Sequence, residues 1–305
     1  MKPFSPEEQH RDSTMFNGQI VEHLRSWLTI NPYKGCSLNC SYCFRVRWFP
    51  SNNPQQVYNT EESLNLLLNH PDFIPNETPV SINNSSTDCL LPAVSISTFQ
   101  AIEIMEEKKL TNPFALITKL KFSKRELNFL KNLNYVKPII FVSLSLIPEL
   151  IEPTPISHRL ENLKNLSNLN LPTVLYFRPI VKGWNDSLET IEKALLIGQE
   201  YCDAICIGGL TISKEIIENL LKNRIIINDY ENSDKATIIQ SNIEKKVLDV
   251  YGKLKLSIPL FKHSSCAVSY FLEVHNYNHL FLNSKRNCLE SCPISQQIIC
   301  KSLNF

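Results

Sequence analysis

The fold of this 305-residue chain is decided by one stretch, Asn31-Pro32-Tyr33-Lys34-Gly35-Cys36-Ser37-Leu38-Asn39-Cys40-Ser41-Tyr42-Cys43-Phe44. Its three cysteines, Cys36, Cys40 and Cys43, are separated by four and then three positions, directly after a predicted strand. Three thiolates can hold three corners of a cubane iron-sulfur cluster, whereas ordinary clusters use four cysteines. The loop therefore predicts a [4Fe-4S] cluster with one iron open to a substrate or cofactor.

Zinc is the competing interpretation of the same loop. A structural zinc ion is held by four protein ligands in a closed tetrahedron. No fourth ligand stands near Cys36, Cys40 and Cys43 in the sequence. The spacing therefore favours the cluster.

Beyond the loop, short apolar segments alternate with amphipathic helical patterns, as expected for strands buried on both faces. The expected strands are Leu24 to Ile30, Val80 to Asn83, Phe114 to Thr118, Ile139 to Leu146, Thr173 to Phe177 and Ala204 to Ile207. The expected helices are one beginning at Thr60, then Ser97 to Lys108, Ser123 to Leu133, Ser157 to Leu166 and Ser187 to Glu200. This alternation predicts an α/β fold, a partial (β/α)6 barrel with ligands at the C-terminal strand ends.

The regular alternation ends near Ile212, which predicts three parts of the chain. Residues 1–23 form a polar arm, residues 24–211 the barrel, and residues 212–305 a cysteine-rich C-terminal extension. Two further helices are expected in the extension, near Lys214 to Lys222 and Asn242 to Leu254.

The cysteine loop resembles that of the radical S-adenosylmethionine (radical SAM) superfamily, whose signature is Cys-x3-Cys-x2-Cys followed by an aromatic residue, here Phe44. Further segments resemble the spore photoproduct lyase-like, or DNA repair photolyase-like, branch over roughly Thr29 to Ile207. They are Asn31 to Cys36, Ser86-Thr87-Asp88, Thr118-Lys119, Glu152-Pro153, Arg159-Leu160 and Pro179 to Asp186. One departure concerns the lyase's hydrogen-donating cysteine, because this chain has Ser85 there and Cys89 beyond Asp88. Repair of thymine dimers is therefore not expected.

The resemblance implies an enzyme that reductively cleaves S-adenosylmethionine to a 5'-deoxyadenosyl radical, which abstracts hydrogen from an organic substrate. At a strand end, Lys119 can meet the cofactor carboxylate while hydroxyls meet the ribose. Alternatively, Lys119 is solvated and the serines bond to backbone. The expected cofactor-binding residues are Tyr42, Phe44, Thr87, Asp88, Lys119, Ser143, Ser145 and Arg178.

Four tail cysteines, Cys266, Cys288, Cys292 and Cys300, have spacings of 22, 4 and 8. Four thiolates outside the barrel match a fully ligated second [4Fe-4S] cluster. Zinc and plain burial are the alternatives. The run from His263 to Tyr270 resembles a C-terminal signature of some radical enzymes in this branch, which favours the cluster.

The charge balance bears on partners, because 31 Lys and Arg against 30 Asp and Glu give a formal net charge of +1. Duplex DNA is therefore not expected as a ligand. We expect a small-molecule, nucleoside-like or peptide substrate and an electron donor such as flavodoxin or ferredoxin. The polar N-terminus and the longest apolar run, Ile139 to Ile147, predict a cytoplasmic protein with no membrane span.

Two alternative functions stay open. The first is a nucleic-acid lesion repair or modification enzyme, since the nearest resemblance acts on DNA. The second is a non-catalytic iron-sulfur or zinc-binding protein, which would have no use for Lys119 and Thr87-Asp88 at strand ends.

Overall fold

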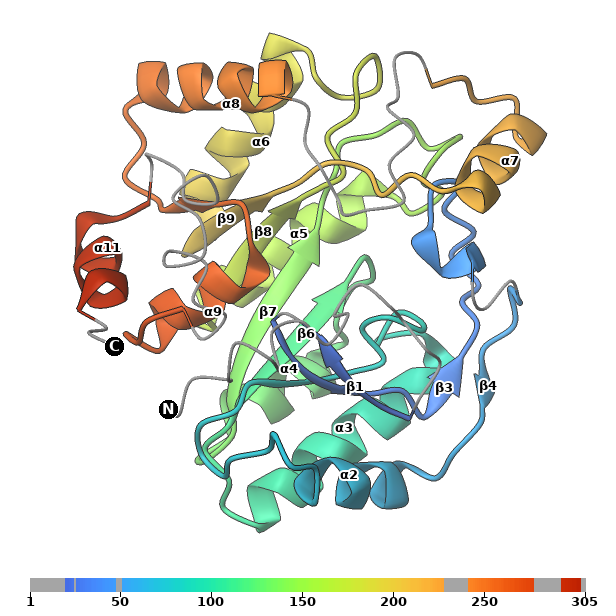
Figure 1. Cartoon of the computed structure of the whole chain (residues 1–305), viewed down its shortest axis with the longest axis vertical. Coiled ribbons are helices and arrows are strands. Elements are labelled where there is room, and N and C mark those ends of the chain that lie inside the picture. The colour runs from blue at the N-terminus through green and yellow to red at the C-terminus, as the bar shows by residue number, and fades with distance from the viewer. Residues whose placement is uncertain (1–19, 25, 48–50, 228–240, 277–291, 303–305) are drawn as a thin grey trace.

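The computed structural model describes residues 20–24, 26–47, 51–227, 241–276 and 292–302. Its centre is an eight-stranded sheet in the order β1-β2-β5-β6-β7-β8-β9-β10 (Figure 1). The strands are β1 Val21–Leu24, β2 Trp27–Ile30, β5 Val80–Ile82, β6 Pro113–Thr118, β7 Lys137–Ser143, β8 Thr173–Phe177, β9 Ala204–Ile207 and β10 Leu260–Phe261. Two short strands, β3 (Tyr33–Lys34) and β4 (Gln55–Gln56), pair with each other beside the cysteine loop.

Neighbouring strands from β2 to β10 run parallel, and only β1 is antiparallel to its neighbour among the described strands of this sheet. The sheet stays open, with β1 and β10 at its edges. This confirms the predicted partial barrel. The six predicted strands correspond to β2 and β5 to β9. The expected first strand, Leu24 to Ile30, is wrong at its start, because Leu24 ends β1 and the chain turns back before β2 begins at Trp27. Strand β10 is additional.

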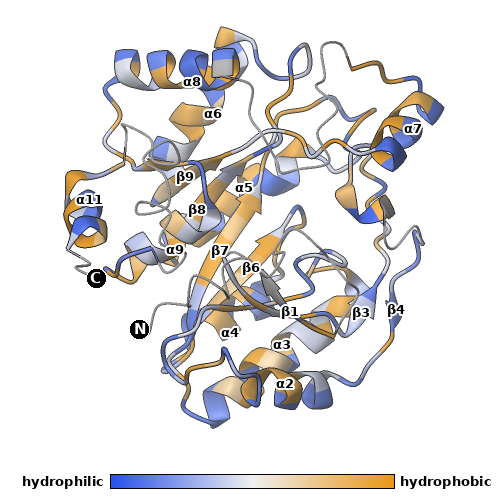
Figure 2. Ribbon diagram, viewed as in Figure 1, coloured by the Kyte–Doolittle hydropathy of each residue, from blue (hydrophilic) through white to orange (hydrophobic). Residues whose placement is uncertain are grey.

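Each central strand is apolar on both faces because both faces are covered. Leu116, Val142 and Leu175 point to the core beneath the helices, and the alternate residues Phe141 and Val174 point to the concave side. Figure 2 shows the apolar character of β6 to β9 as orange strands. The hydroxyl residues Thr118 and Ser143 end β6 and β7, at the carboxyl ends of these parallel strands.

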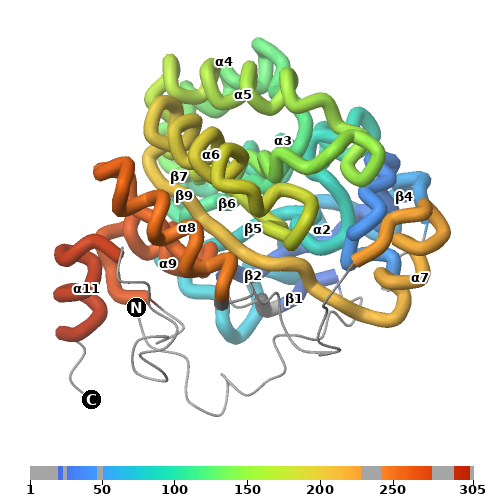
Figure 3. The backbone as a smooth tube through the Cα atoms, turned by 90° about the horizontal axis from the view of Figure 1, so that it is seen from above, coloured from blue at the N-terminus to red at the C-terminus, as the bar shows by residue number. Residues whose placement is uncertain are grey.

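Helices cover the convex face of the sheet, and Figure 3 shows α4, α5 and α6 along this outer side. Their bounds are α2 Thr60–Leu68, α3 Pro92–Glu107, α4 Lys124–Lys131, α5 Ile156–Asn168 and α6 Leu188–Tyr201. The side chains of Asn59, Ser123 and Ser187 accept hydrogen bonds from the first turns of α2, α4 and α6. Helix α3 begins five residues before the expected Ser97, because Pro92 suits the first turn of a helix.

The extension contributes α7 Lys214–Lys222, α8 Ser241–Leu254, β10, α9 Ser264–Phe271 and α11 Ile294–Lys301. Helix α8 packs on α6, and α7 packs beside the 3-10 helix η1, Phe44–Arg47, of the cysteine loop. Ala267 and Val268 of α9 pack against the concave side of the sheet. The division at residue 212 stays a prediction, and the extension adds a strand to the barrel's own sheet. No helix within the described ranges is long and apolar enough to cross a membrane.

Candidate active site

The cysteine loop follows β3 and turns sharply at Gly35, whose φ is +93°. A side chain at Gly35 would place its Cβ 2.4 Å from the carbonyl oxygen of Asn53, so only glycine fits there. The Arg45 guanidinium donates hydrogen bonds to the carbonyl oxygens of Ser51, at 2.6 Å, and Cys36, at 3.3 Å. Backbone geometry and one buried arginine therefore shape the loop.

Two thiols of the loop, those of Cys36 and Cys40, have raised pKa values. Burial raises the pKa of Cys36, and Cys43 raises it further. Burial raises the pKa of Cys40 to about 11, with added repulsion from Cys43 and Cys36. Three soft thiolates in one short loop suit an iron-sulfur cluster.

Within the described ranges, no group of three His, Cys, Asp or Glu side chains forms a site that could hold a metal ion. This includes the triad Cys36, Cys40 and Cys43. The ligands of a single ion converge on one point. Each thiolate of a cubane binds a different iron, so the three need not converge in that way.

Beside the triad lies Glu152, a carboxylate with no exposed surface. Its Oε1 accepts hydrogen bonds from Ser145 Oγ, at 2.9 Å, and from Arg159 Nη1. Its Oε2 accepts a hydrogen bond from the Tyr42 hydroxyl and lies 3.7 Å from Lys119 Nζ. One carboxylate thus joins the cysteine loop, the segment after β7, helix α5 and the end of β6.

Arg159 completes this buried network from the first turns of α5. It is fully buried, and it donates to the carbonyl oxygens of Ser143, at 3.3 Å, and Thr154, at 2.7 Å. Burial raises the pKa of Tyr42 and lowers that of Arg159. The backbone N–H of Ser41 donates to the carbonyl oxygen of Ile151, at 2.9 Å, which adds a second tie between the loop and this segment.

Glu152 and Arg159 were not predicted as site residues. Both stand in segments that carried the family resemblance, and that was the available signal. The sequence does not show that either residue is buried. Charged residues are almost never fully buried unless they are paired, so the pairing becomes evident only once the fold shows their burial.

Lys119 lies at the end of β6, and its side chain is 19% exposed. Its ammonium donates to Ser143 Oγ at 2.8 Å and lies 5.9 Å from the centre of the Tyr42 ring. The structure therefore brings together four of the predicted residues, namely Lys119, Tyr42, Ser143 and Ser145. The two serine hydroxyls bond to side chains of this network, in contrast to the backbone partners of the alternative interpretation.

Asp88 and Thr87 follow β5 but are used differently. Asp88 accepts hydrogen bonds from Thr118 Oγ1, at 2.8 Å, from the backbone N–H of Leu90, at 3.0 Å, and from that of Lys119, at 2.8 Å. Burial raises the pKa of Asp88. The carboxylate thus fixes the end of β6, and its contact with a cofactor stays a prediction. The Thr87 Oγ1 atom is buried and has no hydrogen-bond partner within the described part of the chain.

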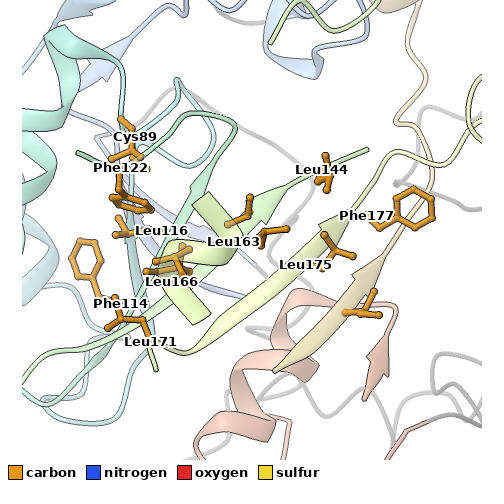
Figure 4. Close-up of a cluster of buried hydrophobic side chains, with 14 of the residues drawn as sticks. Cys89, Phe114, Leu116, Phe122, Leu144, Leu163, Leu166, Leu171, Leu175 and Phe177 are labelled. Carbon is orange, nitrogen blue, oxygen red and sulfur yellow. The ribbon is translucent and has the colours of Figure 1, made fainter. Parts of the chain in front are cut away.

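Cys89 points away from the triad. It is 1% exposed and lies with Phe122 in the core beneath the helices (Figure 4). Its thiol donates to the carbonyl oxygen of Ile117 at 3.4 Å. Ser85, in contrast, donates to Glu22 Oε2 at 3.0 Å. Cys89 is therefore not positioned to replace the hydrogen-donating cysteine that the lyase has near Ser85.

The remaining two predicted cofactor residues lie apart. Phe44, in η1, is 37% exposed. Arg178 follows β8, with its guanidinium carbon 4.8 Å from the centre of the Tyr176 ring.

In the tail, Asn276 joins two cysteines. Its Nδ2 donates to Cys266 Sγ at 3.4 Å, and its backbone N–H donates to Cys300 Sγ at 3.4 Å. Gln296 Nε2 also donates to Cys300 Sγ, at 3.3 Å. Cys292 is partly buried against the concave core, and Cys288 lies outside the described residues. Two of the four predicted ligands therefore approach one asparagine.

Known proteins resemble this chain at low identity, and no family model matches it. Over 165 residues, 52% of this chain and 42% of the other, it is 22% identical to the "Putative L-lysine 2,3-aminomutase" of Aquifex aeolicus (strain VF5).

The crystal structure of Streptococcus suis SuiB bound to S-adenosylmethionine matches with a TM-score of 0.55 and 13% identity, over 83% of this chain and 54% of SuiB. A second SuiB structure gives a TM-score of 0.56, also at 13% identity, over 84% of this chain and 56% of SuiB.

The chain thus spans about half the length of these relatives. At such identity the SuiB match shows the fold alone. Membership of the radical SAM superfamily therefore stays a prediction for this chain, as does the lyase-like branch.

Proposed function

We propose that this chain is a radical SAM enzyme that cleaves S-adenosylmethionine reductively and abstracts hydrogen from an organic substrate. The observation that carries the proposal is the buried Glu152, which joins the tyrosine between two triad cysteines to Lys119 at a strand end. When bound, the cluster and cofactor supply one electron and a 5'-deoxyadenosyl radical. A non-catalytic metal protein would need no such link between its cysteine loop and a lysine.

The roles of the chain's own residues follow from their contacts. Cys36, Cys40 and Cys43 would hold the cluster. Lys119 would bind the cofactor carboxylate, because an ammonium has three donors and the hydrogen bond to Ser143 uses one of them. Thr87 would offer its buried hydroxyl to the ribose.

The network also holds the charged side chains of the site in fixed positions. Glu152 balances part of the positive charge of Lys119 and Arg159, so these side chains stay in place when water is excluded. Exclusion of water protects a reactive intermediate from side reactions.

The deciding experiment is anaerobic reconstitution with iron and sulfide, followed by dithionite and S-adenosylmethionine, with chromatography for 5'-deoxyadenosine. We expect product from the wild type and none from Cys40→Ala. Cys202→Ala, which alters a cysteine packed against the helix-side core, is the matched control and should retain product. An iron-loaded wild type that neither binds nor cleaves the cofactor would refute the proposal.

We further propose a small-molecule, nucleoside-like or peptide substrate and a flavodoxin or ferredoxin as electron donor. The formal net charge of +1 supports a substrate other than duplex DNA. A gel-shift titration at about 150 mM salt, near physiological ionic strength, tests this choice. Nanomolar binding there would favour the lesion-repair alternative.

For the tail we propose a second [4Fe-4S] cluster on Cys266, Cys288, Cys292 and Cys300. The approach of Cys266 and Cys300 to Asn276 supports a shared site. Replacing all three triad cysteines should then lower iron from about eight to about four per chain. Zinc in this purified variant would instead identify a structural zinc site.

A further inference from the structure

Arg178 lies where β8 ends, half-buried, with its guanidinium held on two sides. On one side is the Tyr176 ring, whose centre is 4.8 Å from Cζ. On another is Gly208, after β9, where an added Cβ would lie 2.8 Å from both Cζ and Nε of Arg178. The missing side chain of Gly208 therefore allows the guanidinium its position.

Among the described residues, the positive charge of Arg178 is not balanced by a carboxylate, in contrast to the charges of Lys119 and Arg159. Lys119 and Arg159 both pair with Glu152. Arg178 forms no ion pair within the ranges that the structure describes, and the Cys206 thiol, a weak acceptor, is its polar neighbour. Arginine keeps its charge in proteins, so this half-buried guanidinium retains donors for an anion.

The cofactor has a single carboxylate, and Lys119 is better placed for it. Its Nζ lies 5.9 Å from the centre of the ring of Tyr42, which stands between Cys40 and Cys43 of the triad. Arg178 has no such relation to the triad in the described structure. The cofactor role that the sequence suggested for Arg178 stays a prediction, and the placement of Lys119 favours a different anion for Arg178.

We propose that Arg178 binds an oxyanion of the substrate, a carboxylate or a phosphate group, and that Gly208 and Tyr176 hold the guanidinium in the orientation that this requires. The planar guanidinium can donate two parallel hydrogen bonds to either group. This inference rests on the proposed function, and it narrows the substrate to an anionic molecule.

The test uses the reconstituted enzyme saturated with S-adenosylmethionine, so that the cofactor site is filled. Calorimetric titrations with inorganic phosphate and with acetate then report anion binding and distinguish the two chemistries. We expect one of the two to bind in the millimolar range. Arg178→Gln should weaken that binding at least about tenfold, the loss of one charge-assisted hydrogen bond.

Gly208→Ala is the matched variant, because it keeps the arginine and its charge. The new Cβ meets the far end of a flexible side chain, so the guanidinium moves and the fold is preserved. We expect weaker anion binding in this variant also. Arg178→Lys should recover part of the affinity through charge alone.

Cofactor affinity separates the outcomes. We expect Arg178→Gln and Gly208→Ala to bind S-adenosylmethionine with the same affinity as the wild type. If cofactor affinity falls as much as anion affinity in these variants, Arg178 is a cofactor-binding residue and the proposal is wrong. The proposal is also wrong if the wild type binds neither anion. Failure of the wild type to bind the cofactor would instead refute the proposed function.

Discussion

The triad loop and the tail are two cysteine-rich regions that differ in how far apart their cysteines lie in the sequence. The triad lies within eight consecutive residues, and a buried network under Glu152 ties its loop to three other segments. The tail cysteines span 35 residues, and Asn276 joins two of them. A short loop sets its ligand spacing by local geometry, whereas the tail depends on tertiary packing. The difference predicts that damage at the triad stops the chemistry, and damage at the tail lowers stability first.

The largest effect is expected from the triad itself. Replacing Cys36, Cys40 or Cys43 singly with Ala should abolish 5'-deoxyadenosine formation, because two thiolates cannot hold the cluster with its open iron. Chromatography of the reaction mixture measures the loss. If any of the three variants still cleaves the cofactor, the assignment of the triad as the cluster ligands is wrong.

Glu152→Gln tests the network that holds the loop. The change keeps the shape and removes the negative charge shared by Arg159 and Lys119. Breaking a buried pair costs about 3–5 kcal/mol in the free energy of unfolding. Urea denaturation measures it, with the exposed Glu149→Gln as control. Equal stability of both variants would show that the loop does not depend on the buried carboxylate.

Lys119→Ala should weaken cofactor binding and leave the iron content unchanged. Losing hydrogen bonds from a charged donor costs about 1.5–3 kcal/mol. Calorimetry with S-adenosylmethionine gives the affinity. Lys121→Ala removes a more exposed lysine two positions away, which pairs with Glu161, and should bind the cofactor normally. An unchanged affinity in Lys119→Ala would assign this lysine a structural role only.

Asn276→Ala addresses the tail. It removes a side-chain hydrogen bond to Cys266 and one to Ser265 Oγ, so we expect a loss of about 1–2 kcal/mol in unfolding free energy. Cofactor cleavage at the triad should persist. Thermal unfolding and product chromatography are measured in parallel, with the exposed Ser295→Ala as control. Loss of cleavage at unchanged stability would mean that the two regions are chemically coupled.

The smallest effect concerns the ion pair between the barrel and the extension, Asp186 with Lys246 at 2.9 Å. Burial raises the pKa of Asp186, but Lys246 and the Gly183 N–H outweigh it, so the pKa lies below its usual value. A depressed carboxyl pKa stabilises the fold above the unfolded-state value, about 3.9, and this contribution disappears as the pH falls through the folded-state pKa.

Asp186→Asn should therefore cost up to about 1 kcal/mol at neutral pH, since the pair is partly exposed. Urea denaturation at neutral and acidic pH measures the gap between variant and wild type. The gap should close in acid. A gap that widens in acid would contradict the assigned sign.

The sequence predicted the elements that depend on local patterns. Helix α7, Lys214–Lys222, has the expected bounds, and each of the six central strands overlaps its expected range. The expected strand Leu24 to Ile30 is in fact split between β1 and β2, and β7 ends at Ser143, three residues before the expected Leu146. It did not predict β10, because a two-residue strand gains its identity only by pairing with β9. The Glu152 network was equally hidden, since its links to Tyr42 and Lys119 join segments far apart in the sequence and arise only in the folded chain. The position of the Cys89 side chain could not be predicted from its nearness to Asp88 in the sequence. The structure places this side chain in the core.

Helix α9 also determines how this protein can be engineered. Its Ala267 and Val268 have no exposed surface and pack on the concave side with Phe141 and Val174. Deleting the extension would expose this apolar interior to water, at about 25 cal/mol for each Å². The extension therefore cannot be exchanged as a detachable module, and chimaeras should keep α9 together with the strands it covers.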